Sequence, residues 1–191
     1  MSVSAHDVAD ALRSQLDLHD QTTKLHKLLF YVQAWFAALR GEALFAEEIQ
    51  AYPNGPVVHA LRADERWDRG RPAPQNVDDD GVVDLVVATY GAMIRQDLVD
   101  ATHGLACWRD ARRAAGDDLS WLREGRWHDG RDFASLPMSI EAMAESIRTT
   151  EEFQRFDAEV EAHAEAMTWF SAPLEHNPEL QEYVNRALGS I

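Results

Sequence analysis

The chain has 191 residues, and its apolar content of 46% suffices for one globular domain of ordinary size. Its 33 acidic residues outnumber 18 lysines and arginines, which gives a formal net charge of −15. Such a surface repels phosphate backbones and disfavours nucleic acid as a partner. The same charge would speed association with a basic protein, although acidic surfaces also occur without any such role.

The sequence also disfavours a membrane-spanning protein and a secreted protein. No run approaches the ~18 apolar residues needed to cross a bilayer, and the first residues lack the basic and apolar regions of a secretion signal. We therefore expect no membrane partner. Cys107 is the single cysteine and cannot form an internal disulfide, which suits a reducing compartment. The expected location is cytoplasmic.

The first part of the chain predicts two helices. The first covers 4–16 and is capped by the serine at its start. The second covers 22–40, with Asp20 or Thr22 as its N-cap and Gly41 at its C-terminus. The length of the second helix and its apolar spacing make it the expected centre of the fold.

An apolar stripe runs along the second predicted helix. Its members recur at helical spacing and are Leu25, Leu28, Leu29, Val32, Trp35, Phe36 and Leu39. The stripe predicts a core helix. Lys24, Lys27 and Tyr31 lie off the stripe, and we expect that side of the helix to face a partner.

The middle of the chain predicts short extended segments followed by further helices. Residues 48–55 should be extended with a turn, because residues before proline avoid the helical region. Pro56 fits the first turn of a helix over 57–64, where a proline loses no hydrogen bond. Further helices are expected at 82–92, at 95–103, at 105–115 and after Ser139. The predicted fold class is mainly α: a compact helical domain with short extended segments and an appended C-terminal acidic helix.

The C-terminal segment 149–191 differs from the domain over 1–148. It contains nine acidic residues against two arginines. Residues at helical spacing predict an amphipathic helix that ends before Pro173, namely Phe153, Phe156, Val160, His163, Ala164, Met167 and Phe170. A short helix is expected after Pro178. The apolar face of the longer helix either packs on the domain or contributes to a partner contact or self-association.

The residues that carry chemistry do not form a catalytic or metal-binding motif. His26, His103, His128 and Cys107 lack the paired spacing of zinc ligands. There is no glycine-rich phosphate loop, nucleophile elbow or H-E-x-x-H sequence. We therefore predict no catalytic residue, metal or cofactor. A Cys107 nucleophile with His103 as its base stays open as an alternative, provided that one helix continues through Gly104.

Two separated blocks of sequence carry a family resemblance. The first block comprises the run from Lys24 to Trp35, Gly41, Leu44-Phe45, the run from Glu47 to Tyr52, and Gly55-Pro56-Val57-Val58; the second comprises the run from Leu98 to His103, Trp108 and Ala111-Arg112. In order and spacing they resemble the Panacea domain, the family of SocA-like antitoxins with phage-associated relatives. The resemblance covers about residues 5–148. The chain departs from the family pattern at two places. The first is His26, where the family usually has glutamine and which we expect on a helix surface. The second is Pro53-Asn54 before the Gly-Pro turn.

The resemblance implies a prokaryotic or phage antitoxin that binds and neutralises a cognate toxin. The toxin-binding residues expected from it are Lys24, Lys27, Tyr31, Asn54, His103 and Trp108. Some relatives instead deliver a toxin to a protease, so a proteolytic adaptor is an alternative. Two further alternatives are an enzyme that uses His103 and Cys107 and a regulator that binds its own operator. The sequence offers no basic recognition helix for such a regulator. Homo-oligomerisation stays open.

Overall fold

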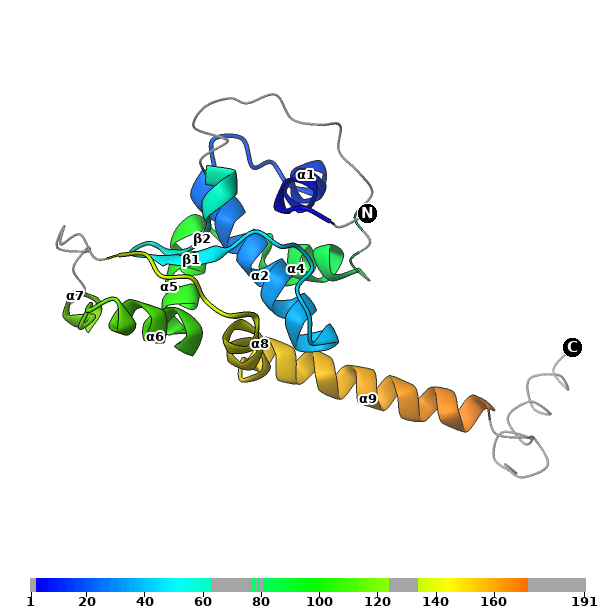
Figure 1. Ribbon diagram of the computed structural model, residues 1–191. Helices are drawn as coiled ribbons and strands as arrows, with labels where there is room; N and C mark the ends of the chain where they lie inside the picture. The colour runs from blue at the N-terminus through cyan, green and yellow to red at the C-terminus, as the bar shows by residue number, and fades with distance from the viewer. Residues whose placement is uncertain (1–2, 63–76, 78, 80, 124–133, 172–191) are drawn as a thin grey trace, which may run out of the picture. The chain divides into compact units, whose positions relative to one another are not determined.

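The computed structural model describes residues 3–62, 77, 79, 81–123 and 134–171, with side chains up to 162 in the last range. The chain divides into two units, 1–149 and 150–191. The first unit is mainly helical, which confirms the predicted fold class. Its elements, in chain order, are α1 (Ala5–Gln15), α2 (Thr22–Arg40), β1 (Ile49–Tyr52), β2 (Gly55–Val58), α4 (Val82–Tyr90), α5 (Arg95–Gly104), α6 (Ala106–Ala114), α7 (Ser120–Arg123) and α8 (Ile140–Arg148) (Figure 1).

Helix α2 is the centre of the first unit. It packs against α1, α4, α5, α8 and the hairpin formed by β1 and β2 (Figure 1). All residues from Leu25 to Ala38 are buried. The six predicted core residues from Leu25 to Phe36 are confirmed, whereas Leu39 is 40% exposed at the helix end. Because α2 is covered on every side from Leu25 to Ala38, the outward position expected for Lys27 and Tyr31 is wrong, whereas Lys24 is half-buried.

The caps of the first two helices agree only in part with the prediction. Ser4 caps α1 as predicted: its hydroxyl accepts from the Asp7 N–H at 3.2 Å, and Asp7 accepts from the Ser4 N–H at 3.0 Å. Gly41 ends α2 with φ 77°, also as predicted. The predicted cap of α2 is wrong, because Gln21 occupies that position and makes no side-chain cap bond. Asp20 has φ 55° and lies in the preceding turn.

Strand β2 replaces the helix predicted to start at Pro56. It pairs antiparallel with β1, with Pro56 opposite Ala51. The Ala51 N–H points away from β2 and donates to the Leu136 carbonyl at 2.9 Å, so this is a pair without mutual hydrogen bonds. The missing N–H of Pro56 therefore removes no hydrogen bond between the strands, and β2 can contain this proline. The helical turn begins only at position 59.

The helices predicted after residue 80 are confirmed with small changes in their bounds. Ser139 caps α8, because its hydroxyl accepts from the Ala142 N–H at 3.2 Å. The chain does not continue as one helix between α5 and α6. Leu105 is extended, with ψ 139°, and separates Gly104 from Ala106.

The second unit contains α9 (Glu151–Ser171). The Thr150 hydroxyl accepts from the Phe153 N–H at 3.3 Å at the start of this helix. The predicted acidic helix is confirmed, and it ends before Pro173. The predicted helix after Pro178 lies outside the described residues. Over the part of the chain that the structure describes, no helix has both the length and the apolar character required to cross a membrane.

Candidate functional site around the hairpin

Lys27 lies beneath the turn of the β1–β2 hairpin and is only 1% exposed. Its ammonium group donates to the Pro56 carbonyl at 2.8 Å. That carbonyl points outward from the hairpin, so a side chain of α2 completes the hydrogen bonding of the strand edge. Burial lowers the pKa of Lys27 to about 7. The amine is therefore about half protonated at neutral pH.

His26 supplies the second contact between α2 and the strand edge. Its Nδ1 accepts from the Val58 N–H at 3.3 Å. Burial, together with the nearby charges of Lys27, Arg62 and Arg13, lowers the pKa of His26 to about 3. The ring is therefore neutral, with its proton on Nε2. This buried Nε2 has no hydrogen-bond partner. The family departure at His26 is thus buried, not on a helix surface as expected.

His103 and Trp108 contact the turn end of the hairpin. Their rings stack with centroids 4.1 Å apart and planes at 22°. The Trp108 indole N–H donates to the Tyr52 carbonyl at 2.9 Å. Burial and the charge of Lys27 lower the pKa of His103 to about 4, against opposing contributions from the Pro53 backbone and Asp100.

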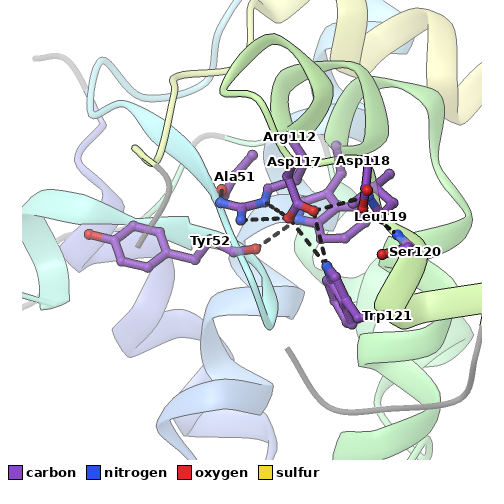
Figure 2. Close-up of polar contacts among 9 residues, drawn as sticks. Ala51, Tyr52, Arg112, Asp117, Asp118, Leu119, Ser120 and Trp121 are labelled. Atoms are coloured by element: carbon purple, nitrogen blue, oxygen red, sulfur yellow. Dashed lines mark hydrogen bonds and ion pairs between the residues drawn. The ribbon is translucent and has the colours of Figure 1, made fainter. Parts of the chain in front are cut away.

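A buried ion pair anchors the outer edge of β1 (Figure 2). Arg112 Nη2 lies 2.7 Å from Asp117 Oδ2, and Arg112 Nη1 donates to the Ala51 carbonyl at 3.3 Å. Asp117 also accepts from the Trp121 indole at 3.1 Å and from the Leu119 N–H at 3.0 Å. Both charged side chains are fully buried. In the sequence, Arg112 was noted only as a member of the second block of the resemblance, and no pattern pointed to Asp117.

A pocket of about 340 Å³ opens beside the hairpin. Its lining comes from the first turns of α2, the hairpin and the residues after β2: Thr22, Thr23, His26, Lys27, Tyr52, Pro53, Asn54, Val57 and Arg62. None of these lining residues is acidic, in a chain with 33 acidic residues. The part of the lining that the structure describes is therefore electropositive.

Four of the six predicted toxin-binding residues meet at the hairpin. They are Lys27, Asn54, His103 and Trp108. Only Asn54, at the tip, is exposed. The surface position expected for the other three is wrong, because the hairpin and its neighbouring helices cover them. These three side chains shape the hairpin from within.

The other two predicted site residues lie against α4. The Lys24 ammonium group donates to the Gly91 carbonyl at 2.7 Å. Tyr31 is buried and stacks on Tyr90 with ring centroids 3.9 Å apart. Its expected surface position is therefore also wrong, because α4 covers that side of α2.

Cys107 does not share a helix with His103, because the chain is extended at Leu105. The Cys107 N–H donates to the Ser146 hydroxyl at 2.9 Å. Burial raises the pKa of the Cys107 thiol, which favours the thiol over the nucleophilic thiolate. Among the residues described, no three His, Cys, Asp or Glu side chains form a group that fits a metal ion.

Comparisons of this chain with protein-family models, with curated proteins and with solved structures found no match. The resemblance to the Panacea domain therefore rests on the sequence blocks alone, and what it implies is a proposal.

Gly55→Ala should lower the free energy of unfolding by about 2 kcal/mol, because left-handed backbone alone costs an L-residue about 1–2 kcal/mol. Gly55 has φ +90°, and an added Cβ would lie 2.7 Å from both Lys27 Cε and Thr102 Oγ1. Urea unfolding checks this value. Gly104→Ala is the control, because its Cβ meets nothing within 4 Å and should stabilise α5. Equal effects of the two variants would contradict the packing described here.

Acid should destabilise the protein through His26 and His103. Their pKa values of about 3 and about 4 lie below the usual 6.5. As the pH falls below 6.5, the unfolded chain binds protons that the folded chain does not, so stability falls. The expected loss is about 2 kcal/mol between pH 6 and pH 5 for the pair. Urea unfolding at these two pH values tests this, and His103→Gln should reduce the loss by about half. A stability that stays level would contradict it.

Proposed function

We propose that this protein is an antitoxin that binds and neutralises a cognate toxin, as the resemblance to the Panacea domain implies. One observation carries the proposal: the two separated blocks of that resemblance meet at a single hairpin. Lys27 and Gly55-Pro56 come from the first block, and Thr102-His103 and Trp108 come from the second. The shared residues thus form one structural unit. The family assignment, the domain over 1–148 and a cytoplasmic location belong to the same proposal.

The proposed binding surface is the outside of that hairpin. Lys27, Trp108 and Arg112 bond its carbonyl groups from within, so its tip is preorganised and loses little entropy when a partner binds. Asn54 at the tip is exposed. The charge of −15 favours fast association with a basic toxin.

The decisive experiment expresses each open reading frame next to this gene, alone and together with it. We expect one frame to stop growth alone, to be tolerated with this protein, and to co-purify with it. Asn54→Arg should reduce both protection and co-purification. Ala92→Arg is the matched control, because it adds the same charge at another exposed position. The absence of a toxic neighbour, or equal protection by both variants, would refute the proposal.

The half-life of the toxin separates inhibition from delivery to a protease. A toxin that stays intact in the complex agrees with neutralisation by binding. A toxin that is degraded only when this protein is present would instead indicate the proteolytic adaptor.

A further inference from the structure

We propose that the pocket beside the hairpin binds an oxyanion, the carboxylate or phosphate group of a small ligand, between His26, Lys27 and Arg62. The inference does not rest on the proposed function, although Asn54 belongs both to this pocket and to the proposed toxin-binding surface. Its volume of about 340 Å³ suits a small molecule.

His26 provides the most specific indication of an acceptor ligand. Its Nδ1 is occupied by the Val58 N–H, so the proton of the neutral ring lies on Nε2. That N–H is buried without a partner, in a ring that lines the pocket. A buried donor without an acceptor costs free energy. Because this nitrogen is sealed from solvent in the structure, a ligand oxygen would satisfy it once the lining opens around the ring.

The other polar groups of the lining are also mostly donors. Lys27 and Arg62 carry positive charge, and the Asn54 amide offers N–H donors. Among the lining residues that the structure describes there is no carboxylate, so they offer a cation no charged ligand. The lining therefore matches an anion, and a guanidinium group binds carboxylate and phosphate especially well.

The start of α2 strengthens the same preference. Thr22 and Thr23 from its first turn line the pocket, and no side chain caps this end of the 19-residue helix. The N-terminus of a helix carries partial positive charge and unpaired N–H groups. These N–H groups add to the Nε2–H donor of His26, which by itself already requires an acceptor.

Binding of an anion should draw a proton to Lys27. The groups that act on this cluster include Arg13 on α1, His26 on α2, His103 and Asp100 on α5, Arg109 on α6, and Arg62 after β2. Burial lowers the Lys27 pKa to about 7. A bound anion raises this pKa, so affinity should fall about tenfold between pH 6 and pH 8, as the free amine loses its proton.

The test titrates the full chain with sulfate and with acetate at constant ionic strength, because both keep their charge between pH 6 and pH 8. Nitrogen-15 NMR of labelled histidine and lysine reports the contact directly, since the chain has only two lysines. We expect a saturable shift of the His26 Nε2–H signal and of the Lys27 ammonium signal. Tighter binding of sulfate would identify a phosphate group as the ligand, and tighter binding of acetate a carboxylate.

Arg62→Gln should weaken binding about tenfold through loss of a charge-assisted contact. Arg95→Gln is the control, because Arg95 is exposed on α5 and does not line the pocket. His26→Asn keeps an acceptor for the Val58 N–H but removes the ring N–H donor, and it should also weaken binding. The proposal is overturned if neither anion moves the His26 signal, if the two arginine variants bind alike, or if affinity is the same at pH 6 and pH 8.

Discussion

Asp117→Asn should lower the free energy of unfolding by about 3–5 kcal/mol, because it leaves the buried charge of Arg112 without its counter-ion. Both side chains are fully buried, with 2.7 Å between Arg112 Nη2 and Asp117 Oδ2. The same change disturbs the contacts of Asp117 with Trp121 and Leu119. Denaturant unfolding measures the loss, and a fall in the midpoint without a change in slope is expected.

Two controls isolate the effect of burial. Asp110→Asn breaks the pair with Arg113, whose side chains are 71% and 58% exposed, and should cost only about 0–1 kcal/mol. The double variant Arg112→Met with Asp117→Leu removes both charges and should recover much of the lost stability. If Asp117→Asn costs no more than Asp110→Asn, the ion pair is not the anchor of β1 that the structure indicates.

Lys27→Met should raise the free energy of unfolding at pH 7 by about 3 kcal/mol, because each pKa unit corresponds to about 1.4 kcal/mol. Lys27 has a pKa of about 7 in the folded protein against the usual 10.5. The loss of its bond to the Pro56 carbonyl offsets part of the gain. Lys24→Met is the matched control on the same helix. It removes the bond of this half-buried side chain to the Gly91 carbonyl, and should destabilise by about 1 kcal/mol.

The stability gained through Lys27→Met should depend on pH. Between pH 7 and pH 10.5 the unfolded chain binds a proton at Lys27 that the folded chain lacks, so this residue makes stability rise with pH. The gain from Lys27→Met should therefore be largest at and below pH 7 and vanish near pH 10.5. Unfolding measured at pH 7, 8.5 and 10 checks this. A gain that does not change with pH would contradict the lowered pKa.

A more stable Lys27→Met variant also bears on the proposed anion site. A buried, partly charged amine lowers stability, a cost that functional residues commonly carry. The variant should bind sulfate more weakly even though it is more stable. Stability and binding would then change in opposite directions, which a purely structural role of Lys27 does not predict.

Local sequence patterns were sufficient for most of the helices. The stripe from Leu25 to Phe36 predicted the core helix because side chains three and four residues apart share a face. Ser4, Ser139 and Gly41 predicted helix ends because their bonds or backbone angles involve only neighbouring residues. In each case the determining interaction spans one or two helical turns.

The candidate site depended on contacts between distant segments. Pro56 reads locally as a helix start, and only its pairing with Ala51 makes it part of a strand. Lys27 and His103 read as surface groups, because nothing in the adjacent residues indicates the hairpin that covers them. Asp117 becomes significant only once Arg112 is buried beside it.

The amino-acid sequence by itself therefore determined the mainly α fold, the central helix and the acidic surface charge, since each follows from composition or from short-range periodicity. The tertiary structure alone decided which polar side chains are buried, that the pKa of Lys27 is lowered, and that His26 has a donor without a partner. The physical reason is desolvation, which depends on every segment packed around a group and not on its neighbours in sequence.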